Sequence, residues 1–361
     1  MSQPNVPQTA GPLLEVQDLK KWYAVRQGML SSLVGRQSGA HVKAVDGVSF
    51  TLQKGEVLGL VGESGSGKST LGELVVQLQA PTSGSIHYRG SDLKSLRGAA
   101  HKRFRRQVQV IFQDPYATLN PRWTIYQTVV EPVQISGIRD PHEAQERVRT
   151  ALTRAGLRPT DGLLGSFPSQ LSGGQRQRVA VARAIVLEPE LVVADEPVSM
   201  LDVSIRSGLL NLLAELRRTM GLSIIFISHD LSTVQYLCDR VAIMYLGKIV
   251  EIGPTEQVMQ RPHHPYARAL LSAVPLADPE ARRVRPQVQG EPSNSIDLPP
   301  GCRFAPRCPF MTTECNAAEP ALDELGPAHY VRCIHPRFEP VWEEVTLEQP
   351  PELGLPANPP G

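Results

Sequence analysis

The 361-residue sequence contains no run of about 18 apolar residues, which is the length that a membrane-spanning helix needs. Its first residues, MSQPNVPQTAGP, include neither a basic nor an apolar segment, so we expect no secretory signal peptide. An excess of charge is also missing, because 37 Lys and Arg residues nearly cancel 36 Asp and Glu residues. These absences argue against a membrane-spanning protein, a secreted protein and a nucleic-acid binder held by a basic surface.

Short apolar runs without alternation predict strands that are buried on both faces of a parallel sheet. These runs are residues 56–62, 108–112, 191–195 and 223–228. Amphipathic patterns at 175–186 and 205–220 predict helices, and Gly221 ends the second. Strands that alternate with helices indicate a layered α/β fold.

Composition divides the chain into a core, an extension and polar ends. Residues 115–170 carry few strand signals and include a charged helical pattern at 140–157, which predicts a helical lobe within the core. Residues 24–43 read as a Gly- and Ser-rich insertion and residues 284–300 as a linker. The expected units are a disordered N-terminus (1–12), the core (13–270), an extension (271–340) and a Pro-rich tail (341–361).

A glycine-rich loop, GESGSGKST at 62–70, matches the phosphate-binding pattern G-x-x-x-x-G-K-[ST]. It follows an apolar run and opens a helical pattern, so backbone N–H groups and a helix N-terminus would surround an anion. We expect Lys68 to reach the β- and γ-phosphates of ATP, Ser69 to bind Mg²⁺ and Thr70 to support the α-phosphate. The predicted ATP contacts of the loop are Gly62, Ser64, Gly65, Ser66, Gly67, Lys68, Ser69 and Thr70.

An acidic pair ends the apolar run LVVADE at 191–196. Strand ends in α/β folds meet at the ligand-binding edge of the sheet, so Asp195 is expected to hold Mg²⁺, directly or through water. Glu196, one residue further, is placed to orient and polarise the attacking water.

A second anion site is predicted at LSGGQRQRVAVARAI, residues 171–185, where Ser172 can cap a helix that begins with two glycines. With this stretch, the sequence resembles the ATP-binding subunits of ABC transporters. The resemblance implies a P-loop ATPase core with a mixed, RecA-like sheet, an antiparallel β subdomain and a helical subdomain. It also implies a dimer in which this signature of one subunit closes on the ATP of the other. The signature residues are Ser172, Gly173, Gly174 and Gln175.

The same resemblance assigns roles to single residues. Tyr23, in LKKWY, would stack on adenine, and Trp22 beside it is the less favoured candidate. Gln113, in VQVIFQDP, would sense the nucleotide and join Ser69 and Asp195 around Mg²⁺. Asp202, in SMLD, would face the partner subunit, although many relatives have Ala where this chain has Met200.

A histidine completes the catalytic group that the resemblance implies. His229, in IFISHD, would contact the γ-phosphate and act with Glu196 and Lys68. A histidine that follows a strand is usually structural. The catalytic role of His229 is therefore inferred only from its position after the other motifs, in the order that the family shows.

A narrower resemblance concerns the second half of the chain. HHPYARALLSAVP (263–275), together with the cysteine-bearing extension, resembles the oligopeptide/dipeptide importers. The insertion before VKAVDGVSF (42–50) resembles the second of their two ATPases. This implies a subunit peripheral to the cytoplasmic face of the bacterial inner membrane. Its implied partners are a non-identical ATPase, two transmembrane permease subunits and, indirectly, an extracytoplasmic solute-binding protein.

Other functions stay open at this point. A soluble ABC-type ATPase of translation or DNA repair is one alternative, although such proteins usually carry two cassettes or a long coiled coil, and no sustained heptads occur here. The transported solute cannot be named from this chain, and nickel complexes or glutathione are alternatives to peptides.

Four cysteines of the extension follow the pattern C-x5-C-x6-C-x17-C, at Cys302, Cys308, Cys315 and Cys333. Four thiolates in one short region can hold zinc or an iron–sulfur cluster. The C-x₂₋₄-C start typical of structural zinc is missing, and the family resemblance favours a [4Fe–4S] cluster. Zinc, free thiols and a disulfide remain alternatives, and a reducing compartment disfavours the disulfide. A metal centre would stabilise a small extension with little core of its own, and a redox- or metal-sensing role is a further alternative.

Overall fold

The computed structural model describes residues 11–25, 41–272, 296 and 298–338. Its strands are β1 Leu14–Ala24, β2 His41–Leu52, β3 Val57–Val61, β4 Ser83–Tyr88, β5 Ser91–Asp92, β6 Val108–Ile111, β7 Leu191–Asp195, β8 Ser223–Ile227, β9 Arg240–Tyr245, β10 Lys248–Pro254, β11 Asp323–Gly326 and β12 His329–Val331. Its α-helices are α1 Lys68–Val75, α2 Gly98–Gln107, α3 Pro115–Thr118, α4 Ile125–Ile135, α5 Pro141–Arg154, α6 Asp161–Gly165, α7 Gly173–Ile185, α8 Val203–Met220, α9 Leu231–Leu237, α10 Thr255–Gln260, α11 Pro265–Ser272 and α12 Glu314–Ala317. Short 3-10 turns are η2 Leu93–Ser95, η3 Pro168–Gln170 and η4 Ala305–Arg307.

The main sheet has eight strands in the order β11-β12-β10-β9-β3-β8-β7-β6. Strands β9, β3, β8, β7 and β6 pair in parallel, and β10, β12 and β11 add an antiparallel edge. Alternate residues of one strand enter different cores: Val192 belongs to the core on one face and Val193 to the core on the other. Burial on both faces explains why the predicted strands read as continuous apolar runs.

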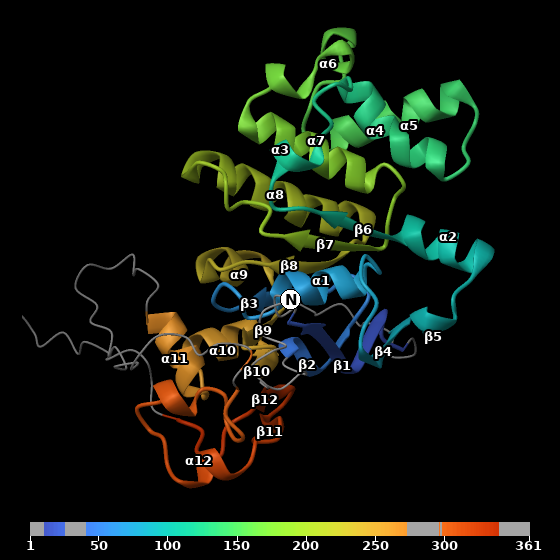
Figure 1. Cartoon of the computed structure of the whole chain (residues 1–361). Helices are drawn as coiled ribbons and strands as arrows, with labels where there is room; N and C mark the ends of the chain where they lie inside the picture. Colours follow the sequence, from blue (N-terminus) through green and yellow to red (C-terminus); the bar gives the residue numbers. More distant parts are fainter. Residues whose placement is uncertain (1–10, 26–40, 273–295, 297, 339–361) are drawn as a thin grey trace, which may run out of the picture.

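A smaller antiparallel sheet, ordered β2-β1-β4-β5, covers one face of the main sheet next to α1 (Figure 1). Leu14 and Leu19 of β1 and Leu71 of α1 share the core between the two sheets. The predicted insertion at 24–43 is wrong at its ends, because β1 runs to Ala24 and β2 begins at His41. Cross-strand pairing between Ala24 and His41 overrides the polar composition there, and residues 26–40 lie outside the described part.

The predicted helical lobe contains α3, α4, α5 and α6, which lie at the top of Figure 1 beyond β6. Asp140 caps α5 by accepting a hydrogen bond from the His142 N–H, and Arg154 ends the helix. Val129 of α4 and Val148 of α5 are fully buried in the core that α7 also enters. In the described part of the chain, no helix is long and apolar enough to cross a membrane.

The cysteine-bearing extension adds strands to the main sheet, since β12 pairs with β10 at Glu251–Val331 and Ile252–Tyr330. Phe304 is only 1% exposed and belongs to the larger core. The extension has little core of its own, as expected, because it leaves Met311, Ile334 and Phe338 exposed and buries Phe304 in the core of the main sheet. The predicted linker lies mostly outside the described residues, as does the predicted tail.

Candidate functional site

The loop of residues 62–67 connects β3 to α1, as the phosphate-binding motif requires. Two of its glycines cannot be replaced without a clash. A Cβ at Gly67, where φ is +102°, would lie 2.0 Å from the Ala44 carbonyl oxygen, and a Cβ at Gly62, where φ is +154°, would lie 2.2 Å from that of Met244. The close packing of the loop against neighbouring strands therefore depends on glycine. Ser64 and Gly65 are exposed at the tip of the loop, and the Ser66 side chain is buried.

Lys68 is buried in this loop, with its ammonium pointing back along the chain. Its Nζ donates hydrogen bonds to the carbonyl oxygens of Gly62, at 2.8 Å, and Glu63, at 2.9 Å. Burial lowers the pKa of Lys68, while the carboxylates of Glu196 and Asp195 oppose that shift. The positively charged Lys68 ammonium therefore lies inside the loop, where the motif predicts that phosphate oxygens bind.

Two of the side chains predicted to hold Mg²⁺ are in contact: Asp195 ends β7, and Ser69 lies in the first turn of α1. Ser69 Oγ donates a hydrogen bond to Asp195 Oδ1 at 3.2 Å. Burial raises the pKa of Asp195, and the hydrogen bond from Ser69 opposes the rise. A hydroxyl and a carboxylate oxygen are ligands that Mg²⁺ prefers, so the donor set fits this ion.

Glu196 brings together residues from three parts of the chain. Its backbone N–H donates to the Ile227 carbonyl at 2.9 Å, which sets Glu196 beside the end of β8. Gln113 Nε2 donates to Glu196 Oε2 at 2.8 Å, and His229 Nδ1 lies 3.2 Å from the same oxygen. Glu196 has a positive φ of 44°, a strained backbone conformation that is common at functional sites. The predicted catalytic carboxylate therefore meets both the predicted sensor glutamine and the predicted histidine.

The signature residues lie at the start of α7, which runs beside the helical lobe (Figure 1). Ser172 Oγ accepts a hydrogen bond from Gln175 N at 3.3 Å, and Ser172 N donates to Gln175 Oε1 at 3.0 Å, which forms a capping box. Gly174 packs so tightly that a Cβ would lie 2.7 Å from Ile205 Cγ2, whereas Gly173 is open except for the Tyr116 hydroxyl at 3.7 Å. Asp202 is exposed at the start of α8.

The two aromatic candidates for the adenine contact have separate partners. Tyr23 donates its hydroxyl proton to Gln79 Oε1 at 2.6 Å. Trp22 donates its indole N–H to Asp46 Oδ1 at 3.0 Å, and Lys43 Nζ lies 4.8 Å from its ring centroid. Both side chains lie at the end of β1, and nothing in this geometry decides between them.

Sequence reasoning missed the partners of Glu63, the residue after Gly62. Its carboxylate pairs with Arg307 of the extension, with 3.0 Å between Nη1 and Oε2, and its N–H donates to the Tyr266 hydroxyl at 2.8 Å. Arg307 directly precedes Cys308 of the cysteine pattern, and Tyr266 stands in HHPYARALLSAVP, but neither pattern indicates contact with the phosphate loop.

The four cysteines of the extension line one small cavity together with His264 and Phe304. Burial raises the pKa of Cys302, Cys308 and Cys333, the last to about 12, and nearby thiols add to each shift. Within the described residues, no three His, Cys, Asp or Glu side chains are placed so that they could hold a metal ion. Four cysteines are a donor set that zinc and iron–sulfur clusters use, but the side-chain placement does not confirm the predicted cluster.

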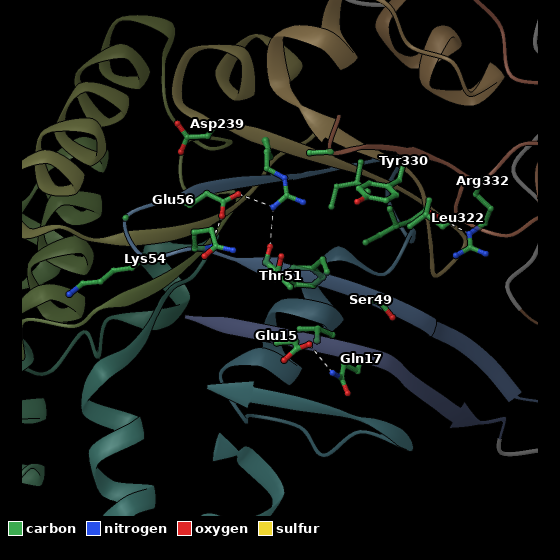
Figure 2. A pocket seen from close by; sticks show the side chains of 18 of the residues that line it. Glu15, Gln17, Ser49, Thr51, Lys54, Glu56, Asp239, Leu322, Tyr330 and Arg332 are labelled. Atoms are coloured by element: carbon green, nitrogen blue, oxygen red, sulfur yellow. Dashed lines mark hydrogen bonds and ion pairs between the residues drawn. The ribbon is translucent and has the colours of Figure 1, made fainter. Parts of the chain in front are cut away.

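Figure 2 shows a larger cavity, of about 950 Å³, which no residue of the phosphate loop lines. It opens between the small sheet, with Glu15 and Thr51, and the edge formed by Leu322 and Tyr330. Glu56 and Arg240 pair across its wall at 3.0 Å. None of the predicted site residues lines it.

Comparison with known proteins identifies the family. The pattern described as ABC transporter matches residues 45–199, and that described as oligopeptide/dipeptide transporter, C-terminal region, matches residues 250–315. The chain is 46% identical over 326 residues to a putative peptide import ATP-binding protein of Brucella ovis, covering 90% of this chain and 98% of the relative. It is 44% identical over 324 residues to the oligopeptide transport ATP-binding protein AppF of Bacillus subtilis, covering 89% and 96%. The dipeptide transport ATP-binding protein DppF of Haemophilus influenzae is 44% identical over 331 residues, covering 90% and 97%.

Solved structures agree with this assignment. The chain superposes on cbiO1 from Clostridium perfringens, part of the ABC transporter complex cbiONQ, with a TM-score of 0.57 and 29% identity, covering 68% of this chain and 90% of the other. The chain also superposes on a dimeric bacterial ABC transporter cassette, MJ0796, with a TM-score of 0.57 and 25% identity. This match covers 67% of this chain and 98% of the other. This chain therefore belongs to the ABC ATPases, as an ATP-hydrolysing subunit of the oligopeptide and dipeptide transporter branch.

Proposed function

We propose that this subunit binds Mg-ATP between Lys68, Ser69 and Asp195, and that Glu196 orients the attacking water. The meeting of Gln113, Glu196 and His229 at one carboxylate oxygen carries this proposal. In it, Lys68 neutralises phosphate charge, and His229 contacts the γ-phosphate beside Glu196. Bound Mg²⁺ would supply further charge neutralisation, with Ser69, Asp195 and Gln113 as its protein ligands.

The proposed transported solutes are dipeptides and oligopeptides, which the printed names of the relatives support. The test is uptake of a radiolabelled dipeptide by membrane vesicles that contain the assembled transporter. ATP-dependent uptake that is lost in K68A supports the proposal. Uptake of nickel complexes or of glutathione in place of peptides would reject the choice of solute, and unchanged uptake by K68A would reject the role of the loop.

We propose that the chain works as an ATP sandwich with a second, non-identical ATPase. The supporting observation is a capped helix N-terminus with an open Gly173, at the signature, in addition to the phosphate loop. Purification of the tagged chain from membranes in the presence of ATP should yield a different ATPase chain in equal amount. Recovery of this chain alone, as a homodimer, would contradict the heterodimer.

We propose that the helical lobe docks on two transmembrane permease subunits, which keeps the chain peripheral on the cytoplasmic face of the inner membrane. An extracytoplasmic solute-binding protein would deliver the solute to these subunits. Large side chains that the lobe leaves exposed support the docking: Tyr116 at 60%, Ile135 at 77% and Phe167 at 41%. In cells without the permease subunits, the chain should move to the soluble fraction. Stable retention on those membranes would contradict docking through protein contacts.

We propose that Cys302, Cys308, Cys315 and Cys333 hold a metal centre, with [4Fe–4S] favoured over zinc. The shared cavity of the four thiols supports this proposal. Chain purified without oxygen should be brown, with about four irons and four sulfides, and Cys→Ser at any of the four positions should bleach it. Colourless protein with one zinc per chain would show that the site binds zinc and not a cluster. Metal-free protein would reject both metals.

A further inference from the structure

The phosphate loop of this chain contains a carboxylate of its own, at Glu63. A negative charge in a loop that binds a polyphosphate repels the ligand, and this repulsion is stronger at a partly buried site than in water. The Glu63 side chain is 33% exposed, and its charge is among those that raise the pKa of Lys68. Lys68 Nζ also donates a hydrogen bond to the Glu63 carbonyl oxygen at 2.9 Å, so Glu63 lies beside the ammonium that would meet the phosphates.

Arg307 covers this carboxylate with its guanidinium fork. Its Nη1 lies 3.3 Å from Glu63 Oε1 and 3.0 Å from Oε2, and its Nη2 lies 3.3 Å from Oε1. The Arg307 side chain is only 11% exposed, so water and salt screen the pair less than they screen a surface ion pair. Burial alone lowers the pKa of Arg307, but its hydrogen bonds to Glu63 and Tyr245 outweigh burial, so the side chain stays charged.

An aromatic cluster holds Arg307 against the loop. The ring centroids of Tyr245 and Tyr266 are 4.6 Å apart, and Phe304 lies 5.4 Å from the first and 5.5 Å from the second. All three side chains are at most 2% exposed. The Tyr266 hydroxyl accepts the Glu63 N–H, so the cluster contacts both the backbone of the loop and the element that carries Arg307.

A second arginine ties the same element to the ATPase. Arg303, next to Cys302, forms an ion pair with Asp46 of β2 and donates to the carbonyl oxygen of Leu246. Both charged side chains are less than 10% exposed. The turn of residues 302–308 is thus anchored on two sides, and Arg307 has little freedom to leave Glu63.

We infer that Arg307 is a positioning residue for ATP, which neutralises Glu63 and fixes the phosphate loop, so that the cysteine-bearing extension completes the nucleotide site of its own chain. The inference rests on the proposed binding of ATP at this loop. It predicts that removal of Arg307 exposes the phosphates to the charge of Glu63 and weakens ATP binding, while an uncharged residue at position 63 removes the need for Arg307.

The experiment is a double-mutant cycle on the purified full-length chain, in which the Kd for Mg-ATP is measured by calorimetry. R307A should raise the Kd about tenfold, and R307K, which keeps the charge but loses the fork, by about threefold. E63Q should bind ATP as tightly as the wild type or more tightly. In the E63Q background, R307A should change the Kd by less than about twofold.

A matched control uses Arg217, whose ion pair with Asp239, at 2.8 Å, lies near the opposite end of β3. R217A should leave the Kd unchanged. An equal effect of R307A in both backgrounds, or none in the wild type, would overturn the inference, and melting curves identify variants that do not fold. If K68A still binds ATP at wild-type affinity, the proposed ATP site fails, whatever Arg307 does.

Discussion

The side-chain amide of Gln113 donates a hydrogen bond to Glu196 Oε2 at 2.8 Å. Gln113 follows β6 at the entrance to the helical lobe, and Glu196 follows β7. One hydrogen bond therefore joins the proposed catalytic carboxylate to the segment that leads into the proposed docking lobe.

Replacement of Glu196 by Gln should preserve ATP binding and lower kcat by about 10²- to 10⁴-fold, because the amide cannot accept a proton from the attacking water. Phosphate release by the assembled transporter measures kcat, and calorimetry measures binding. The matched control is E190Q, just before the other end of β7, where Glu190 pairs with Arg89. Turnover by E196Q close to the wild-type rate would reject the assigned role.

Replacement of Ser172 by Arg should abolish ATP-dependent dimerisation and hydrolysis, because a long side chain would fill the place of the partner's γ-phosphate. Part of any loss comes from the helix cap, which contributes about 1 kcal/mol. S172A, which removes the hydroxyl and its cap but adds no bulk, therefore serves as the comparison and should keep more activity than S172R. Light scattering with ATP and ADP measures dimerisation, and survival of dimer and activity in S172R would contradict the sandwich.

Ala at Gly67 should destabilise the chain more than Ala at Gly65. Both positions have positive φ, at +102° and +79°, which costs about 1–2 kcal/mol for Ala. Only Gly67 has a backbone oxygen, that of Ala44, at 2.0 Å from the added carbon, whereas Gly65 has no atom within 4 Å. We expect G67A to lose at least twice as much unfolding free energy as G65A, measured by urea denaturation without nucleotide. Equal losses would show that the close contact carries no energy.

Acid should destabilise the fold through His264. Burial, with a smaller contribution from Arg332, lowers the pKa of His264 from 6.5 to about 3, and its Nδ1 accepts the Tyr266 N–H at 3.0 Å. Between these two values the unfolded chain takes up a proton that the folded chain refuses, so stability falls as the pH drops below 6.5. From pH 6.5 to 5 this amounts to about 2 kcal/mol.

The variant H264N tests this pH dependence, because its amide oxygen can accept the same N–H and does not titrate. Its absolute stability should be lower, since the smaller side chain leaves space in the core. The relevant quantity is the difference between its unfolding free energies at pH 6.5 and pH 5, which should be about 2 kcal/mol smaller than in the wild type. The same acid sensitivity in both proteins would rule out His264 as the source.

Sequence patterns predicted the elements of the ATPase core well. Residues 191–195 form β7 as predicted, and the predicted helix at 205–220 is α8, Val203–Met220, which Gly221 ends in a left-handed conformation. The signature helix at 175–186 is α7, Gly173–Ile185. These features depend on neighbours within a few residues, so their patterns are readable without the fold.

The extension shows where such patterns stop. Its four cysteines suggested a unit stabilised by metal, and no periodic signal indicated that β12 would pair with β10 or that Phe304 would enter the main core. The strands β11 and β12 are only four and three residues long, too short for a clear alternation.

The sequence alone predicted the phosphate loop, the acidic pair, the signature and the layered α/β class. These features depend on local backbone conformation and on the period of burial, which residues close together in the sequence determine. Only the tertiary structure placed Arg307 on Glu63, 244 positions away, and Gln113 and His229 on Glu196. Such pairs form only when the packing of helices and strands brings side chains that are distant in the sequence together. The distance between two residues in the sequence does not predict such a pair, because the entropy of closing a long loop depends only weakly on the length of the loop.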